Sequence, residues 1–225
     1  MRKTHMYKFS MSTRKIQALF RPLRTGGPLN YINEIYGLNK PELSVPIMKL
    51  VHCHKPLSEQ TLHALLKDHM HTGCNLCRCR VLYGGVAGWS ERLYDIAKPS
   101  YPTVTRKECD NFVYDLFIRA PLRGRMMEEQ ALDDLTNSLP HYRFRFADDK
   151  TDIQFAVDIE CLRDHKVIAG VQVKPLSFLK QPAAVEVNHM KNDRWGLPVY
   201  YLYYDKNGLF TKSSWVAILQ QLQKI

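Results

Sequence analysis

The sequence has no long hydrophobic run and no hydrophobic N-terminus. None of its apolar stretches approaches the roughly 18 residues that a membrane-spanning helix needs. Residues 1–8 are mostly polar and basic, and they lack the apolar segment of a secretory signal. We therefore predict a cytoplasmic protein that has no membrane partner.

Acidic residues are missing from the first part of the chain. Seven Lys or Arg residues precede the first acidic residue, Glu34, and the whole chain has a formal charge of +10 and a pI of about 9.3. A chain this basic favours a polyanionic partner, and nucleic acid is the commonest one. The alternative is a solvated basic surface without such a partner.

Internal repeats and low-complexity segments are also absent. Hydrophobic residues make up 45% of the chain and aromatic residues 11%, which is enough for a packed core and argues against wholesale disorder. We predict two parts. Residues 1–105 form a mainly helical, basic region that could bind DNA or form a dimer contact, and residues 106–225 form an α/β core.

The six cysteines are not expected to form disulfides, because the chain shows no export signal. Cys74 and Cys77 have the two-residue gap of a zinc knuckle, and Cys53, Cys79 or a nearby histidine could complete four ligands. A full zinc signature has two such pairs, and this region has one. We therefore favour reduced, partly buried cysteines with surface histidines over a structural zinc site.

Two stretches, residues 152–160 and 167–175, alternate between apolar and polar residues with a period of two. This pattern predicts two half-buried strands, and the short polar segment between them suits a hairpin. Pairing the strands can bring Asp158, Gln172 and Lys174 together on one surface. A carboxylate, an amide oxygen and an ammonium group there could form a site for a hard divalent cation.

Two further carboxylates share this surface by parity. Glu160 follows Asp158 by two residues and is a candidate ligand. Asp152 would lie about 20 Å from Asp158 along an extended strand, at roughly 3.3 Å per residue. We therefore do not expect Asp152 to be a ligand.

A helical pattern covers residues 108–139, as two helices that break near Pro121 and Gly124. In the second helix, Glu128 falls on the same side as the apolar residues Ala131, Leu132, Leu135 and Leu139. Burying an unpaired charge is costly. Glu128 therefore either lies at the rim of the core or faces a cation or a base.

The second strand is followed by a helix over residues 182–192, a strand over residues 199–204 and a helix over residues 213–222. The first of these helices carries polar side chains that are candidates for contacts with DNA phosphates: Asn188, His189 and Lys191.

This order of elements resembles the PD-(D/E)xK nuclease superfamily and, within it, the type II restriction endonucleases. The resemblance covers residues 123–222 and includes Val-Asp-Ile-Glu at 157–160 and Gly-Val-Gln-Val-Lys-Pro at 170–175. It implies a restriction-endonuclease-like core, with a mixed sheet flanked by helices. It also implies a prokaryotic enzyme that uses Mg²⁺ and acts on double-stranded DNA.

The resemblance also implies roles by position. Asp158 matches the metal-binding aspartate, and Lys174 matches the lysine that positions or activates the attacking water. Gln172 stands where most members have Asp or Glu, so its amide oxygen can bind a cation but one negative charge is lost. Glu128 is the first candidate for the missing carboxylate, and Glu160 is the second.

The sequence therefore predicts a type II restriction enzyme that acts as a homodimer on a short palindrome, since a two-fold dimer cuts two strands symmetrically in the simplest way. Two alternatives remain open. One is a structure-specific or repair nuclease of the same superfamily. The other is a non-catalytic, zinc-containing nucleic-acid-binding protein in which the hairpin is structural.

Overall fold

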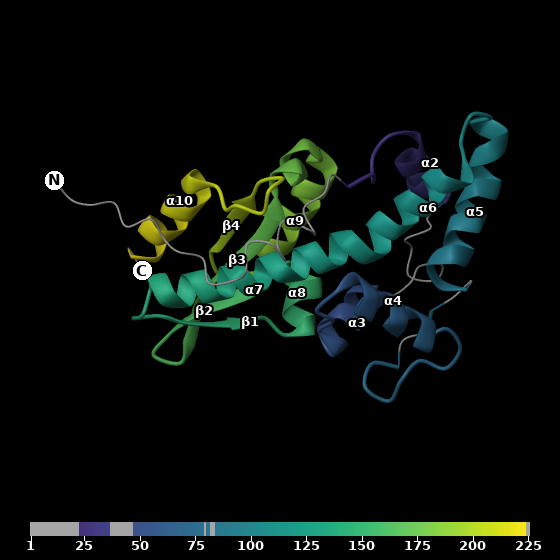
Figure 1. Cartoon of the computed structure of the whole chain (residues 1–225). Helices are drawn as coiled ribbons and strands as arrows, with labels where there is room; N and C mark the ends of the chain where they lie inside the picture. The colour runs from purple at the N-terminus through teal and green to yellow at the C-terminus, as the bar shows by residue number, and fades with distance from the viewer. Residues whose placement is uncertain (1–22, 37–46, 79, 82–83, 224–225) are drawn as a thin grey trace.

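The computed structural model describes residues 23–36, 47–78, 80–81 and 84–223. They form a mixed α/β structure, in which a mainly helical N-terminal portion adjoins a sheet flanked by helices (Figure 1). This confirms the predicted fold class. None of the described helices is long and apolar enough to cross a lipid bilayer.

The described helices of the N-terminal portion are α2 (Pro28–Tyr36), α3 (Ile47–His54), α4 (Glu59–Asp68) and α5 (Gly85–Ser100). They are joined by one hydrophobic core, whose largest fully buried side chains include Leu50, Leu62, Trp89, Leu93 and Phe112. Removal of this apolar surface from water is the main force that holds these short helices together, since few of them would be stable alone.

A long helical run connects this portion with the sheet. It consists of α6 (Arg106–Tyr114), the π-helical turn η1 (Asp115–Arg119) and α7 (Ala120–Ser138). The run begins at a capping box, in which the Glu108 N–H donates to Thr105 Oγ1 and the Thr105 N–H donates to the Glu108 carboxylate. These two bonds fix the start of the helix.

The helix break predicted near Pro121 and Gly124 is wrong, because the helix continues through both residues. Proline has no N–H to donate, and its ring clashes with the preceding turn of an ordinary α-helix. Here the preceding turn is the wider π form, in which the Ala120 N–H donates to the carbonyl of Asp115. The π turn therefore explains how the helix accommodates Pro121.

The long run passes from one hydrophobic core to another. Leu122 belongs to the core of the N-terminal helices, whereas Met127 belongs to a second core built on the sheet. The change of core therefore falls within α7. The boundary between two parts at residues 105 and 106 stays a prediction.

The sheet has the strand order β1-β2-β3-β4, with β1 (Arg143–Phe146), β2 (Ile159–Arg163), β3 (Lys166–Pro175) and β4 (Val199–Tyr204). β2 is antiparallel to both β1 and β3, whereas β3 and β4 are parallel. The predicted hairpin is present as β2 and β3. Its two-residue turn, Asp164 and His165, has φ values of 49° and 63°, the left-handed geometry that a tight hairpin favours.

The sheet separates two layers of helices. Val171 and Val173 of β3 face the second core, which α7 and α10 (Lys212–Leu222) help to form. The other face of β3 is covered by α9 (Pro182–Trp195), since the Trp195 ring lies over Gly170. The strand that carries Gln172 and Lys174 is therefore held from both sides.

The first strand of the hairpin is shorter than predicted. Residues 149–155 form the helix α8 (Asp149–Phe155), whose first turn is capped by Asp148 through a hydrogen bond from the Thr151 N–H. Ala156 ends this helix in a left-handed conformation, with φ of 54°, and β2 begins three residues later. The strand prediction for residues 152–158 is therefore wrong, because a capped helical turn outweighs an alternating pattern this short.

Gly170 lies where β3 passes against α9. A Cβ atom at this position would come within 2.8 Å of both the Trp195 ring and the Val157 side chain. Val157 is fully buried, so it has little freedom to move away. The close packing of strand and helix therefore depends on the absence of a side chain at this residue.

We expect Gly170→Ala to lower the free energy of unfolding by about 1–3 kcal/mol, because Val157 and Trp195 must shift to admit the methyl group. Gly124→Ala is the matched control, since a Cβ there would meet no atom within 4 Å. Alanine within α7 should leave stability unchanged or raise it by up to about 1 kcal/mol. Urea denaturation of both variants measures the difference, and equal stabilities would contradict the tight packing at Gly170.

Candidate active site

Asp158 lies between α8 and β2, and its backbone is fixed on both sides. Its N–H donates to the carbonyl of Val171 at 3.1 Å, and its carbonyl accepts from the Ala147 N–H at 3.1 Å. Its carboxylate accepts a hydrogen bond from the Val173 N–H at 2.6 Å and lies 3.7 Å from Lys174 Nζ. The structure thus brings together Asp158 and Lys174, and both are attached to the same strand pairing.

A side chain of α9 fixes the segment that leads to Asp158. Asn192 Nδ2 donates to the carbonyls of Phe155 and Ala156 at 2.7 and 3.1 Å, and Asn192 Oδ1 accepts from the Tyr201 hydroxyl at 2.6 Å. This buried amide therefore joins the end of α8 to β4. The sequence analysis missed Asn192, and a lone Asn on a polar helix gave no signal for this role.

Gln172 points to the same side of β3 as Lys174, two residues away. Its side chain is buried, with 1% of the residue exposed, and among the described residues no hydrogen bond reaches its Oε1 atom. An unsatisfied buried oxygen is costly. This oxygen therefore remains able to bind a cation.

Glu128 projects from α7 with 13% of its side chain exposed, and its carboxylate lies 3.8 Å from Arg125 Nη1. Burial raises the pKa of Glu128, and the nearby carboxylate of Asp158 raises it further, to about 8; Lys174 and Arg125 act in the opposite direction. Glu128 is thus electrostatically coupled to the predicted pair, although it comes from a different layer of the fold.

Asp152 belongs to the same group of charges, contrary to the expectation from the sequence. Burial raises its pKa to about 6, with a further rise from Asp158. The predicted separation of about 20 Å assumed an extended strand. The helix α8 shortens the path at about 1.5 Å per residue, so Asp152 lies near enough to interact with Asp158 and Lys174.

Two basic residues of this group were also missed. His52 of α3 lies 3.9 Å from the Asp152 carboxylate, and burial followed by the positive charge of Arg125 lowers the pKa of His52. Arg125 has 8% of its side chain exposed, pairs with Glu129 at 3.1 Å and lies over the Phe146 ring at 4.1 Å from the centroid. A single sequence offers no signal for the contacts of His52 with Asp152 and of Arg125 with Phe146, because each joins separate elements. The Arg125–Glu129 pair, by contrast, has the four-residue spacing of neighbours on one helix.

Glu160, the second candidate for the missing carboxylate, has a different partner and lies farther along the sheet from Lys174. Its carboxylate accepts a hydrogen bond from Arg145 Nε at 2.7 Å. In the β2–β3 pairing it lies opposite Gly170, four residues from Lys174, or about 13 Å of extended strand. Among the predicted carboxylates, Glu128 is therefore coupled more directly to Asp158 and Lys174 than Glu160 is.

A cleft of about 630 Å³ adjoins this group of charges. Its polar lining residues come from α3, α7, β3 and the segment after β3, and they include Lys49, Arg123, Glu128, Lys174 and Ser177. The cleft therefore gives solvent, or a ligand of moderate size, access to Lys174 and Glu128.

The predicted phosphate contacts on α9 lie nearby, but two of them already have protein partners. Lys191 Nζ donates to the carbonyl of Ile153 at 2.9 Å, and the His189 ring lies 5.5 Å from the Tyr201 ring. Asn188 is half-buried. Contact of these residues with DNA stays a prediction.

The cysteine candidates lie in another part of the molecule. Cys74 and Cys77 approach each other, with their Sγ atoms 3.5 Å apart, and they gather with His54 and His69. Cys53 is not a member of this group, although it precedes His54 directly. Cys79 lies outside the described residues.

The comparisons with known proteins identify a restriction endonuclease family. A family model described as MjaI restriction endonuclease matches residues 28–212. The match covers most of the chain and contains Glu128, Asp158, Gln172 and Lys174. No curated protein and no solved structure matches the chain.

We expect the stability of Glu128→Gln, relative to the parent protein, to increase with pH when divalent cations are absent. Below the ordinary pKa of 4.5, Glu128 is neutral in both the folded and the unfolded chain; between 4.5 and about 8, ionisation increasingly favours the unfolded chain. The glutamine side chain of the Glu128→Gln variant cannot ionise, so the variant does not lose folding stability in this way as the pH rises. Melting temperatures between pH 5 and pH 9, measured with a chelator present, would show the relative gain.

Glu129→Gln is the control for this measurement, because it changes the neighbouring and more exposed carboxylate, which also pairs with Arg125. An equal gain with pH in Glu129→Gln, or no gain in Glu128→Gln, would contradict the buried, coupled position of Glu128.

Proposed function

The chain belongs to the MjaI restriction endonuclease family and is thus a deoxyribonuclease acting on phosphodiester bonds, and we propose that it cleaves double-stranded DNA at a specific sequence with Mg²⁺ as cofactor. The observation that carries this proposal is the pairing of Asp158 with Lys174 beside Gln172, on a strand that is fixed from both sides. We further propose that these residues form a PD-(D/E)xK site in which Gln172 replaces the usual second carboxylate.

The donor atoms of this site fit a hard divalent cation. Asp158 and Glu128 offer carboxylate oxygens, and the buried Oε1 atom of Gln172 accepts no hydrogen bond from the described residues. Asp152 adds a further carboxylate at the edge of the group. When bound, Mg²⁺ supplies Lewis-acid polarisation of the phosphate and lowers the pKa of water.

Lys174 is the residue that we assign to the reacting phosphate. Its ammonium group lies 3.7 Å from Asp158 and has 25% of its side chain exposed, so it can reach both the carboxylate and a molecule in the cleft. A positive charge there can hold the attacking water and stabilise the negative charge that develops on the phosphate. The hydrogen bond from the Val173 N–H holds the Asp158 carboxylate in place beside Lys174.

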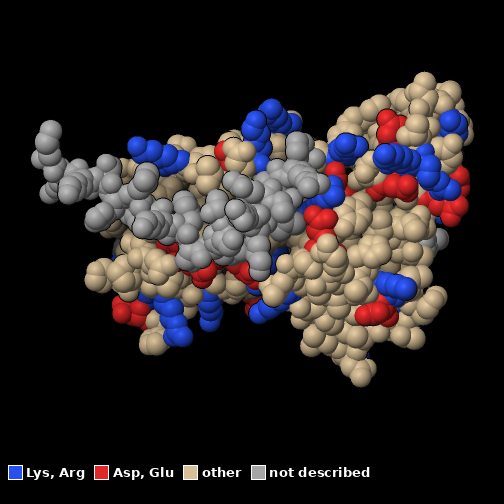
Figure 2. Space-filling view, in the orientation of Figure 1, with Lys and Arg blue, Asp and Glu red and all other residues tan. Residues whose placement is uncertain are grey.

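The approach of DNA requires positive charge, and the distribution of charge in the chain suggests where it comes from. Figure 2 shows Lys and Arg intermixed with Asp and Glu on one face of the molecule, without a single continuous basic patch in the part that is coloured. Residues 1–22 contain six Lys or Arg and no acidic residue. We propose that this segment contributes to the binding of the DNA backbone.

We also propose that the enzyme acts as a homodimer on a palindromic site. One chain carries one Asp158–Lys174 pair, whereas a double-strand break requires two cuts. A two-fold dimer would place one active site on each strand with the same local sequence.

We expect the protein to cut plasmid DNA into discrete fragments when Mg²⁺ is present, and we expect Lys174→Ala and Asp158→Asn to reduce the rate at least about 100-fold. Lys166→Ala is the matched control, because Lys166 is an exposed lysine at the start of the same strand. Gel electrophoresis with sequenced fragment ends measures the rate, the site and the cut position.

The outcomes separate the proposals from one another. Unchanged cleavage by Lys174→Ala would overturn the site assignment. Nicking or branch cutting without fixed sites would favour a structure-specific nuclease. Binding of DNA without any cleavage, with or without Mg²⁺, would contradict the catalytic role.

A further inference from the structure

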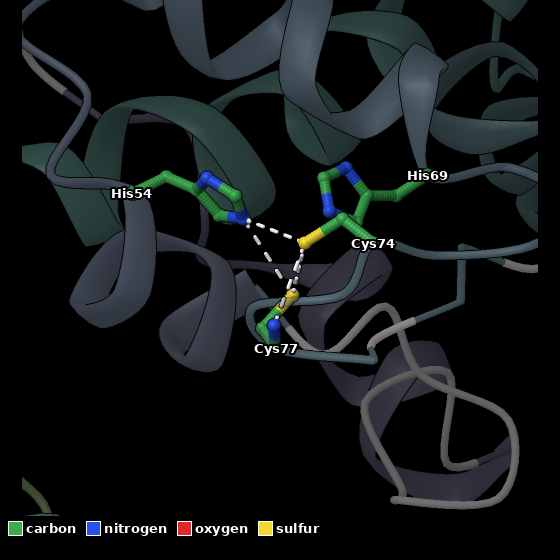
Figure 3. A group of neighbouring side chains, drawn as sticks. All are labelled: His54, His69, Cys74 and Cys77. Atoms are coloured by element: carbon green, nitrogen blue, oxygen red, sulfur yellow. Dashed lines mark hydrogen bonds between the residues drawn. The ribbon is translucent and has the colours of Figure 1, made fainter.

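A second polar cluster lies among the N-terminal helices and takes no part in the proposed catalytic site. It consists of His54, His69, Cys74 and Cys77, whose side chains point toward one another (Figure 3). Their four donor atoms all lie within 4.8 Å of one another. In the described part of the chain, this cluster is the one group of three or more His, Cys, Asp or Glu side chains whose ligand atoms lie this close together.

The distances within this cluster are those of a tetrahedral metal site. His54 Nε2 lies 3.3 Å from Cys74 Sγ and 3.6 Å from Cys77 Sγ, and the two sulfur atoms are 3.5 Å apart. A tetrahedron with bonds of about 2.0 Å to nitrogen and 2.3 Å to sulfur has edges of about 3.3–3.8 Å. The three donor atoms therefore already lie at the spacing that one bound ion would require.

The fourth residue, His69, is oriented as a metal ligand. Its Nδ1 atom lies 2.7 Å from the carbonyl of Leu65, so Nδ1 carries the proton and the lone pair is on Nε2. The residue is 3% exposed, and Nε2 has no hydrogen-bond partner among the described residues. A buried imidazole nitrogen without a partner is costly unless it binds something, and this nitrogen belongs to the cluster.

The four residues come from three separate segments. His54 is the last residue of α3, His69 follows the end of α4, and Cys74 and Cys77 lie in the loop before α5. The backbone N–H of Cys77 also contacts Cys74 Sγ at 3.4 Å, an interaction that stabilises a thiolate. One ion bound here would fix the loop to the ends of both helices.

We propose that His54, His69, Cys74 and Cys77 bind one structural Zn²⁺ ion. Two nitrogen and two sulfur donors in tetrahedral arrangement suit zinc, whereas the oxygen donors around Asp158 suit Mg²⁺. Four protein ligands leave no position for a substrate, so the ion stabilises the fold and does not react. His54 and His69 are histidines near the cysteine pair, as the sequence allowed, and the candidate Cys53 does not belong to the set.

The first test is the metal content of the full-length chain, purified without a histidine tag and without chelator. We expect about one zinc ion per chain by inductively coupled plasma mass spectrometry, and a loss of most of it in Cys77→Ser and His69→Asn. Two matched controls, Cys53→Ser and His71→Asn, change the same residue types nearby and should keep the ion. His71 is exposed and Cys53 is half-buried.

The second test does not depend on the folding of a variant. Replacement of the ion in the parent chain by Co²⁺ should give thiolate-to-cobalt charge-transfer bands and the visible bands of a tetrahedral site. Removal of the ion should lower the melting temperature, and Zn²⁺, but not Mg²⁺, should restore it.

Three results would overturn the proposal. The first is a parent chain with far less than one zinc ion that also gives no cobalt bands. The second is a disulfide between Cys74 and Cys77, detected by mass spectrometry. The third is an equal loss of zinc in the controls. None of these depends on DNA cleavage, so the zinc site and the nuclease function are tested separately.

Discussion

The hydrogen bond from the Val173 N–H to the Asp158 carboxylate is the interaction on which the proposed active site depends. It holds the charged group that directly precedes β2 against the C-terminal part of β3, while the backbone of Asp158 is hydrogen-bonded to Val171 and Ala147. The carboxylate therefore cannot turn away from Lys174 without losing this hydrogen bond. Because Gly170 has no side chain, Trp195 and Val157 pack closely against it, so the same strand is also fixed against α9. The geometry of the proposed active site and the packing of the sheet thus depend on the same strand, β3.

Two helices extend this constraint to the N-terminal portion. In the long helical run, Leu122 belongs to one core and Met127 to the other, and the same stretch places Arg125 beside Glu128. The π turn that accepts Pro121 keeps this run continuous. α3 has a similar double role, since His52 lies toward Asp152 and His54 belongs to the proposed zinc site. A zinc ion that fixes the end of α3 would therefore also steady one wall of the proposed active site.

The sequence predicted the features that depend on regular spacing. The alternation in β3 placed Gln172 and Lys174 on one side, and the three- and four-residue spacing around Glu128 placed it on the inner side of a helix. The predictions from the sequence were wrong where short polar contacts determine the local structure. A strand was expected at residues 152–158, but residues 149–155 form α8, which Asp148 caps. As a result, Asp152 lies near enough to Asp158 for their charges to interact. Asn192 and His52 contact distant elements, so no local pattern could reveal their roles. For Cys74 and Cys77 the sequence allowed a nearby histidine as a partner but could not say which one.

The electrostatics of the proposed site are consistent with the cation that we propose for it. The negative charges of Asp158, Glu128 and Asp152 influence one another, and the pKa values of Glu128 and Asp152 are raised first by burial and then by Asp158. Lys174, Arg125 and His52 offset this charge only in part, because Arg125 is also paired with Glu129 and burial lowers the pKa of His52. A DNA phosphate approaching Lys174 would meet like charge from these carboxylates. A divalent cation held by Asp158 and Glu128 would reduce both effects, since it would stabilise the ionised form of Glu128 and attract the phosphate.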